Sequence, residues 1–282
     1  MEKIWQTSRR KLSCEKTLVM GILNITPDSF SDGGKFASTG DALKRVEQMI
    51  GEGADIIDIG GESTRPGSAR VSAAEEIARV APVIEAVAKN FDIPISIDTS
   101  KAEVAEKAVH AGAEIINDIS GLRFDARVAE VAGRTKAGLV LMHLRGSFET
   151  MHKQEPVPDI IQEVENGLKW SIGKAREFGV EDQQIALDIG LGFSKTFEQN
   201  LELMAKLDEI CRAFPAFPVL AGSSRKSFIG KLLGDAPVTE RLPGSLASAA
   251  VSVWNGANIV RVHDVKETAR TVRVVEAIKR QK

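Results

Sequence analysis

The 282-residue sequence is poor in cysteine and contains no long apolar run. Its two cysteines, Cys14 and Cys211, match no metal-ligand spacing and cannot form the disulfide framework of a small secreted domain. We therefore expect two free thiols in a reducing cytosol. No apolar run approaches the ~18 residues that a membrane span needs, and segment 1–17 lacks the apolar centre of a signal peptide. These absences predict a cytoplasmic protein.

The sequence also lacks a strong charge of either sign. Its net charge is −2 and its isoelectric point is near 6.2, so no basic face is expected for a nucleic acid or a membrane surface. Small ligands, including anionic ones, remain open as partners. The hydrophobic content of 43% is enough to fill a sizeable core.

Short β-branched runs alternate with longer amphipathic stretches along the chain, which is typical of βα units around a parallel sheet. The predicted strands cover 18–23, 55–60, 94–98, 114–118, 138–143, 184–188, 217–222 and 258–263. Helix-like segments follow them, for example 73–90, 101–112 and 265–280, with apolar residues at helical spacing. Eight such units in this length predict an α/β fold, one (β/α)₈ TIM barrel over 1–282, rather than an open doubly wound sheet.

Polar residues follow most of the predicted strands. Barrel enzymes place their chemistry at the C-terminal strand ends, so these residues are candidates for a site. They are Asn24, segment 61–67, Asp98, Asn117, His143, Asp188, segment 223–226, Arg261 and His263. A single Asp at a strand end is more often a cap for the next helix. So many polar ends around one mouth indicate a binding site.

The residue types suggest two kinds of ligand group. Asp98, Asn117 and Asp188 offer carboxylate and amide groups that can pair with the N–H groups and ring nitrogens of a flat heterocycle. Arg261 and His263 lie two apart on one strand and so share a face, which suits a phosphate or pyrophosphate. The alternative for the arginine is an ion pair with Asp264 or with another carboxylate of the barrel.

Further cations are expected on the same rim, at Arg65, Arg225 and Lys226. No acidic or histidine cluster resembles a fixed transition-metal site. A loosely held Mg²⁺ that accompanies a pyrophosphate is the expected metal, with Asn24 as an oxygen ligand. Asp58, inside the second strand, is expected to have a buried structural role.

The series of motifs resembles the dihydropteroate synthase family of folate biosynthesis over nearly the whole chain. The matching motifs, in the family's order, are "GILNITPDSFSDGG" (21–34), "DIIDIGGESTRPG" (55–67), "ISIDTSKAEVA" (95–105), "INDISG" (116–121), "GFSKT" (192–196), "GSSRKSFIG" (222–230) and "RVHD" (261–264). The resemblance implies a transferase that condenses 6-hydroxymethyl-7,8-dihydropterin pyrophosphate with p-aminobenzoate. It also implies a cytoplasmic homodimer and a sulfonamide target.

The resemblance also implies residue roles. By resemblance to the family, the residues that bind the pterin would be Asp98, Asn117, Asp188 and Lys226, with Met142 packing against the ring. Those that bind the pyrophosphate and Mg²⁺ would be Asn24, Arg261 and His263. The p-aminobenzoate slot would be lined by Phe30, Pro66, Phe193 and Ser227. Asp32 would organise the closed state with Mg²⁺. The leaving group or the second loop would be contacted by Thr64 and Arg65. The loops after the first two strands would close over a dissociative reaction that needs no dedicated base.

Two departures from the family pattern leave alternatives open. Ile189 and Phe148 stand where the family usually has proline. A non-catalytic pterin-binding paralogue could tolerate such changes. A methyltetrahydrofolate-dependent corrinoid methyltransferase would share the pterin set, but it has no use for a pyrophosphate clamp.

Overall fold

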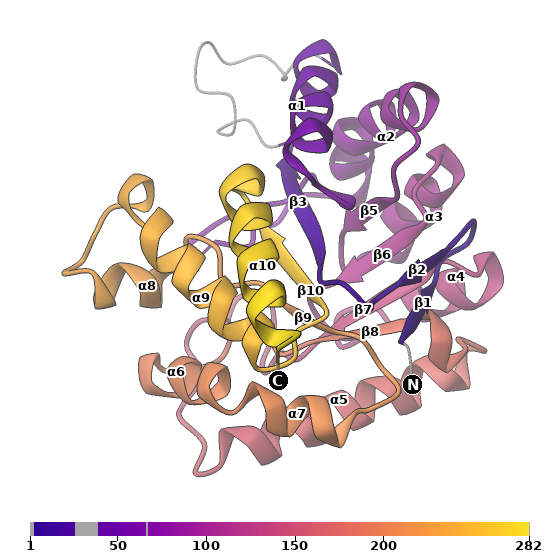
Figure 1. Ribbon diagram of the computed structural model, residues 1–282. Coiled ribbons are helices and arrows are strands. Elements are labelled where there is room, and N and C mark those ends of the chain that lie inside the picture. The colour runs from indigo at the N-terminus through magenta and orange to yellow at the C-terminus, as the bar shows by residue number, and fades with distance from the viewer. Residues whose placement is uncertain (1–2, 26–38, 66, 282) are drawn as a thin grey trace.

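The computed structural model describes residues 3–25, 39–65 and 67–281, and it confirms the predicted α/β barrel (Figure 1). Eight parallel strands close into a barrel in the order β10-β3-β4-β5-β6-β7-β8-β9. They are β3 (Leu18–Asn24), β4 (Ile56–Gly60), β5 (Ile95–Asp98), β6 (Ile115–Asp118), β7 (Gly138–Met142), β8 (Ile185–Asp188), β9 (Val219–Ala221) and β10 (Ile259–Val262). Every predicted strand is present, with bounds within two residues of the prediction.

Helices surround the barrel and connect its strands (Figure 1). The helices are α1 (Thr39–Glu52), α2 (Ala73–Asn90), α3 (Ala102–Ala111), α4 (Arg127–Thr135), α5 (Ile160–Glu177), α6 (Phe197–Ala205), α7 (Leu207–Ala213), α8 (Ser227–Leu232), α9 (Leu242–Trp254) and α10 (Val265–Lys279), with short 3₁₀ turns η2 (Asp182–Gln184) and η3 (Val238–Glu240). The predicted helix 73–90 matches α2, where the Ser72 side chain accepts from the Glu75 amide. Gly112, at φ 123°, ends α3 as its stop signal predicts.

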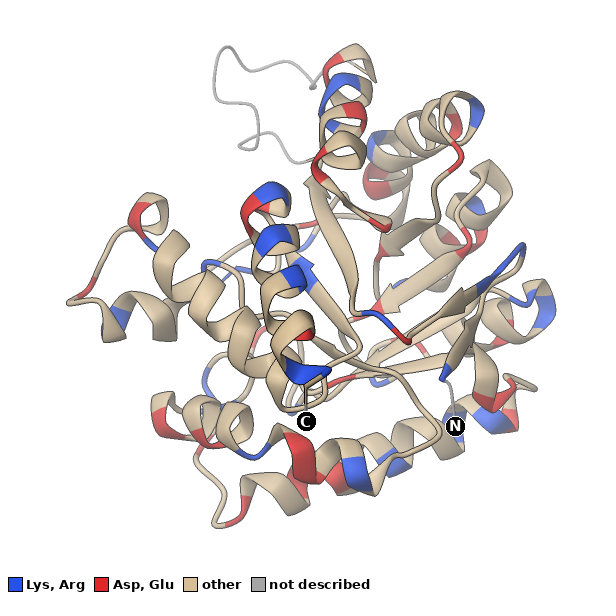
Figure 2. Cartoon of the chain, viewed as in Figure 1, with Lys and Arg blue, Asp and Glu red and all other residues tan. Residues whose placement is uncertain are grey.

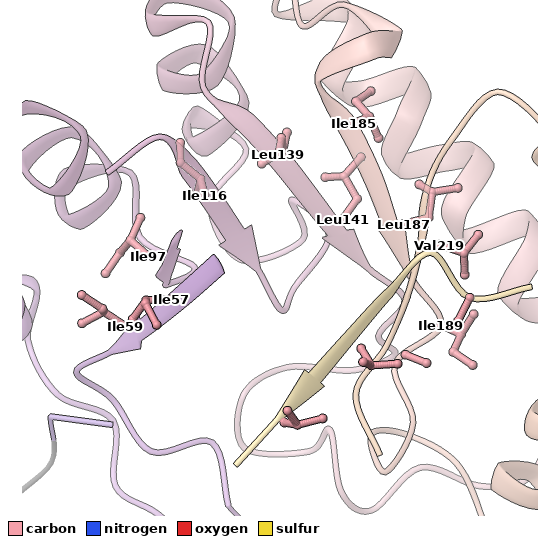
Figure 3. Close-up of a cluster of buried hydrophobic side chains, with 14 of the residues drawn as sticks. Ile57, Ile59, Ile97, Ile116, Leu139, Leu141, Ile185, Leu187, Ile189 and Val219 are labelled. Atoms are coloured by element: carbon pink, nitrogen blue, oxygen red, sulfur yellow. The ribbon is translucent and has the colours of Figure 1, made fainter. Parts of the chain in front are cut away.

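The main core lies between the strands and the helices. Side chains that point outward from the strands, such as Ile57, Ile59, Leu139 and Leu187, are fully buried there (Figure 3). Each contributes about 1.5–3 kcal/mol through removal from water. Charged residues lie mostly on the helices and loops, whereas the strands are largely free of them (Figure 2). Three of the charged strand residues, Asp58, Asp98 and Arg261, are joined by hydrogen bonds of Arg261 in the site described below.

A second apolar cluster fills the inside of the barrel, and an N-terminal hairpin covers it. Inward side chains such as Met20, Ile56 and Val140 are buried there with Trp5. Trp5 belongs to the hairpin of β1 (Ile4–Gln6) and β2 (Lys11–Ser13), and its Nε1 donates to the Gln184 carbonyl oxygen at 2.8 Å. The hairpin therefore closes the N-terminal end of the barrel. It is an element that the sequence analysis did not predict.

Strand alternation then places the polar residues. Because side chains alternate between the two faces of a strand, the residue two positions after an inward apolar residue also points into the barrel. Asp58 follows Ile56 in this way, and Asn117 follows Ile115. The same spacing relates Val140 to Met142, Ala186 to Asp188 and Ile259 to Arg261. These residues form the inner layer nearest the C-terminal mouth.

Candidate active site

Arg261 lies at the centre of the inner polar layer, between two carboxylates. Its Nε donates to Asp58 Oδ2 at 2.6 Å and its second guanidinium nitrogen, Nη2, donates to Asp98 Oδ2 at 2.6 Å. The side chain is 20% exposed, so one edge remains open to the mouth. Arg261 therefore forms its ion pairs with carboxylates of the barrel, which is one of the alternatives that the sequence left open. It does not pair with Asp264, which pairs with Arg225.

Asp58 is the residue whose importance the sequence analysis missed. It is fully buried as expected, but its Oδ2 also accepts from Asn117 Nδ2 at 3.2 Å, so it connects Asn117 with Arg261. Its Oδ1 is buried and finds no hydrogen-bond partner among the described residues. A buried acceptor without a partner is costly unless a ligand donates to it. The signal available in the sequence was its inward position two residues after Ile56.

The Asp98 carboxyl group has a pKa near neutral pH. Burial raises its pKa to about 7, against the opposing effect of Arg261, and the Asp58 carboxylate raises it further. Near neutral pH this carboxyl group can therefore either donate or accept a hydrogen bond. Such a group suits recognition of a ring that presents both N–H groups and unprotonated nitrogens.

The buried Asp188 and the half-buried Lys226 are a second set of charged groups that interact electrostatically. Burial raises the pKa of Asp188 and Lys226 opposes that shift, while the Asp188 Oδ1 accepts from the Gly190 amide at 2.7 Å. Burial lowers the pKa of Lys226 to about 8. Its ammonium group donates to the Leu191 carbonyl and lies 4.6 Å from the centre of the Phe193 ring. A flat ligand here would find a carboxylate, an ammonium group and an aromatic ring together.

An apolar cluster forms one wall beside these polar groups. Met142 is buried in it, and so is Phe148, one of the two residues that depart from the family's proline. The cluster contains Ile119, Met142, Leu144, Phe148 and Met151, with Phe124 and Phe193 packed against it. Ile189, the other departure, is fully buried in the main core. Both departures therefore supply packing side chains to ordered parts of the fold.

His263 lies just beyond β10, two residues after Arg261, and has a neutral ring. Burial and the charges of Arg261 and Arg225 lower its pKa to about 3. The Ser224 hydroxyl lies 3.1 Å from its Nδ1 and also accepts from its backbone amide at 3.2 Å. Ser224 thus fixes the position of the ring.

Asn24 ends β3, and Gly60 at the end of β4 lies between it and Asp98 at the end of β5. A Cβ atom at Gly60, the neighbouring strand end, would lie 3.6 Å from Asn24 Oδ1 and 3.5 Å from the Asp98 Cβ. Among the described residues, no group of three or more His, Cys, Asp or Glu side chains could hold a metal ion. A cation at this edge would therefore depend on ligands that arrive with a substrate.

Comparison with known proteins decides the family. Residues 20–263 match the family model described as pterin binding enzyme. A dihydropteroate synthase of Synechocystis is 48% identical over 264 residues, which are 94% of this chain and 91% of that protein. The chain belongs to the dihydropteroate synthase family. Membership confirms the predicted enzyme class, a transferase of folate biosynthesis, rather than a corrinoid methyltransferase.

Solved structures of the dihydropteroate synthase family have the same fold. The Yersinia pestis dihydropteroate synthase with a sulfonamide drug superposes with a TM-score of 0.92 at 41% identity, covering 98% of this chain and 99% of that one. The Xanthomonas albilineans dihydropteroate synthase with 4-aminobenzoic acid gives 0.91 at 38% identity, covering 99% of each chain.

The structure brings together most of the residues predicted from the dihydropteroate synthase resemblance. Asp98, Asn117 and Arg261 lie within one hydrogen-bonded group with Asp58. His143 does not belong to it, because its side chain points away from the barrel interior and packs against Gly167 of α5.

The remaining predicted residues lie around this centre or outside the described residues. Thr64 and Arg65 lie in the β4–α2 loop, where Arg65 is exposed, and Ser227 is exposed at the start of α8. The predictions for Phe30, Asp32 and Pro66 fall outside the described residues.

Proposed function

We propose that this site condenses 6-hydroxymethyl-7,8-dihydropterin pyrophosphate with p-aminobenzoate to give 7,8-dihydropteroate and pyrophosphate. The observation that carries the proposal is the buried group of Asp58, Asp98, Asn117 and Arg261 at the mouth of the barrel. It offers several acceptors and one fixed cation to a flat, nitrogen-rich ring. The family relatives solved with 4-aminobenzoic acid and with a sulfonamide drug support the second substrate and the sulfonamide sensitivity.

The pterin ring is proposed to lie over the inner polar layer. Asp98, with a pKa of about 7, can match either a ring N–H or a ring nitrogen, and the unpartnered Asp58 Oδ1 can accept another N–H. Asp188 and Lys226 would bind the far edge of the ring, and Met142 would pack against its face. Buried carboxylates also favour the positive charge that develops on the pterin methylene carbon as the bond to pyrophosphate breaks.

The pyrophosphate is proposed to leave through the edge formed by Asn24, Arg261 and His263. The exposed edge of the Arg261 guanidinium can bind its oxygens, and the neutral His263 ring, held by Ser224, can donate from its other nitrogen. Asn24 supplies one hard oxygen ligand, which fits Mg²⁺ held largely by substrate phosphates and water. When bound there, Mg²⁺ would neutralise charge on the leaving group.

The p-aminobenzoate is proposed to enter beside Phe193, Lys226 and Ser227. Its aromatic amine is already neutral near pH 7 and therefore needs to be positioned rather than deprotonated. The ammonium group of Lys226, close to the Phe193 ring, can attract the carboxylate of this substrate toward the slot.

The deciding experiment measures pyrophosphate release by the purified protein. The pterin pyrophosphate, Mg²⁺ and p-aminobenzoate are each supplied or omitted in turn, and dihydropteroate is quantified in the same samples. Release with dihydropteroate formation should require all three components. Tight pterin binding without release would contradict the proposal and favour the non-catalytic paralogue.

A homodimer is proposed to form through α9 and α10, which pack against each other on the outside of the barrel. These helices expose four large apolar side chains, Val251, Trp254, Val274 and Ile278. Val274 and Ile278 are 60% and 54% exposed and lie one helical turn apart. Large apolar side chains exposed on two helices that pack against each other suit a second copy of the chain.

The structure contains no helix, among the described residues, that is long and apolar enough to cross a membrane. A cytoplasmic location remains part of the proposal.

A further inference from the structure

The loop between β4 and α2, residues 61–72, is fixed where it leaves the barrel. Lys101 Nζ bonds to Glu62 at 2.9 Å and to the fully buried Glu76 at 2.6 Å. Arg79 donates to the Gly61 carbonyl oxygen at 2.7 Å. The first two residues of the loop are therefore held against α2 and α3.

Two residues further along, the loop is held from another part of the barrel. The Thr64 carbonyl oxygen accepts from His152 Nε2 at 2.9 Å. His152 lies in the β7–α5 loop, residues 143–159, and β5 and β6 separate β4 from β7 in the barrel. The same two loops meet again where the Arg70 guanidinium lies 5.4 Å from the centre of the Phe148 ring.

The His152 ring also reaches a third loop. It stacks on Phe193 of the β8–α6 loop, with ring centres 5.4 Å apart and an interplanar angle of 30°. One side chain thus contacts both Thr64 and Phe193. Phe193 is in turn beside the Lys226 ammonium group, at 4.6 Å from its ring centre.

We infer that His152 is a positioning residue that holds Thr64 and Phe193 in the arrangement that receives the second substrate. The inference rests on the proposed function, because it concerns the p-aminobenzoate slot of that same site. Neither the strand-end pattern nor the motifs that carry the family resemblance single out His152.

The position of His152 predicts which substrate depends on it. The groups proposed to bind the pterin, Asp98, Asn117 and Asp188, lie on strands and have their own hydrogen bonds. Thr64 and Phe193 lie on loops, where position depends on contacts such as those of His152. Loss of the His152 side chain should therefore weaken binding of p-aminobenzoate and leave binding of the pterin substrate nearly unchanged.

The test compares three substitutions that separate the two contacts. His152→Ala removes both, His152→Gln keeps an amide donor for Thr64 without the ring, and His152→Phe keeps the ring without the donor. His110→Ala serves as the matched control, because His110 lies on the outer helix α3 and is mostly exposed. KM for each substrate, kcat and the melting temperature are measured for every variant.

His152→Ala should raise KM for p-aminobenzoate about tenfold, while KM for the pterin pyrophosphate and kcat change by less than about threefold. The Gln and Phe variants should each recover part of the loss, and His110→Ala should behave as the wild type. An unchanged KM for p-aminobenzoate in His152→Ala would overturn the inference. An equal rise in both KM values, with no recovery by Gln or Phe and a lowered melting temperature, would also overturn it in favour of a folding role.

Failure of the proposed function has a different result. In that case the wild-type protein itself would form no dihydropteroate from the two substrates, and the inference about the p-aminobenzoate slot would fail with it. An active wild type together with an unaffected His152→Ala variant would remove only the inference.

Discussion

At the scale of single residues, the site depends on one arginine, Arg261, that forms ion pairs with two carboxylates. Arg261 bonds to Asp58 and to Asp98 at 2.6 Å each, so its charge is shared before any substrate binds. The sequence identified Arg261 and Asp98 from their places at strand ends. It could not show which carboxylate the arginine would meet, because that partner depends on how distant strands pair when the barrel closes. Asp58 was consequently undervalued.

Arg261→Ala should destabilise the fold as well as abolish most turnover. It leaves two buried carboxylates without their cation, which costs about 3–5 kcal/mol of unfolding free energy. Adding Asp58→Asn to Arg261→Ala removes one of the stranded charges and should recover about 1 kcal/mol or more. Urea denaturation of the two single variants and the double variant measures this coupling. Strictly additive losses would show that the two residues do not interact.

Asp98→Asn should change how stability depends on pH. Burial raises the pKa of Asp98 from 3.8 in the unfolded chain to about 7 in the fold, so the folded protein holds this proton more tightly. The group stabilises the fold fully below about pH 4, and this contribution is lost as the pH rises through about 7. The asparagine has no such loss.

The unfolding free energy of Asp98→Asn, relative to the wild type, should therefore increase between about pH 4 and about pH 8. Urea titrations at several pH values give this difference directly, and other buried carboxylates such as Asp118 cancel because both proteins contain them. A difference that stays constant across the range would mean that Asp98 is ionised throughout.

At the scale of elements, periodicity predicted the barrel strands and major helices well, because each carries several residues of repeating pattern. The helix 73–90 and the stop at Gly112 are examples. The β1–β2 hairpin escaped prediction because strands of three residues are too short for such a pattern. The contact between His152 and Thr64 escaped for another reason: it joins loops 88 positions apart, and nothing local in either loop indicates the other.

Trp5→Ala should test the role of the hairpin. The substitution removes a fully buried indole and its hydrogen bond to Gln184, with an expected cost of about 3–5 kcal/mol of unfolding free energy. Because the hairpin closes the end of the barrel opposite the site, KM values of the folded variant should be close to those of the wild type. Thermal and urea unfolding, with steady-state kinetics at low temperature, check both expectations.

Trp170→Ala is the matched control for Trp5→Ala, since Trp170 is 45% exposed on α5 and should cost less than about 1 kcal/mol. Equal losses in the two variants would mean that the hairpin adds nothing to the closure of the barrel. A large change in KM for Trp5→Ala would show that the two ends of the barrel are coupled.

At the scale of the whole molecule, large apolar side chains are exposed on α9 and α10, although α10 also carries several charged residues. The exposed apolar residues Val251 and Trp254 lie on α9, and Val274 and Ile278 lie on the second half of α10. The sequence suggested pairing of the last helices only from the family resemblance. Which of their residues face solvent depends on how α9 and α10 pack on each other, and that required the structure.

Ile278→Glu should convert the proposed dimer into a monomer. A carboxylate at position 278 of the proposed interface would have to lose its water on association, which costs several kcal/mol. Light scattering after size exclusion measures the mass of the wild type and of the variant, with Arg280→Glu on the same exposed end as the charge control. A wild-type mass equal to one chain, 30.4 kDa, would contradict the proposed dimer.

The apolar cluster inside the barrel affects how salt screens the charges of the site. Met20, Ile56 and Val140, with Trp5 below them, form an apolar layer of low dielectric constant beneath the charges of the site. Neither water nor dissolved salt can approach those charges from that side, so their field is screened only at the mouth. Added salt should therefore slow the arrival of anionic substrates far more than it weakens the interactions among Asp58, Asp98 and Arg261.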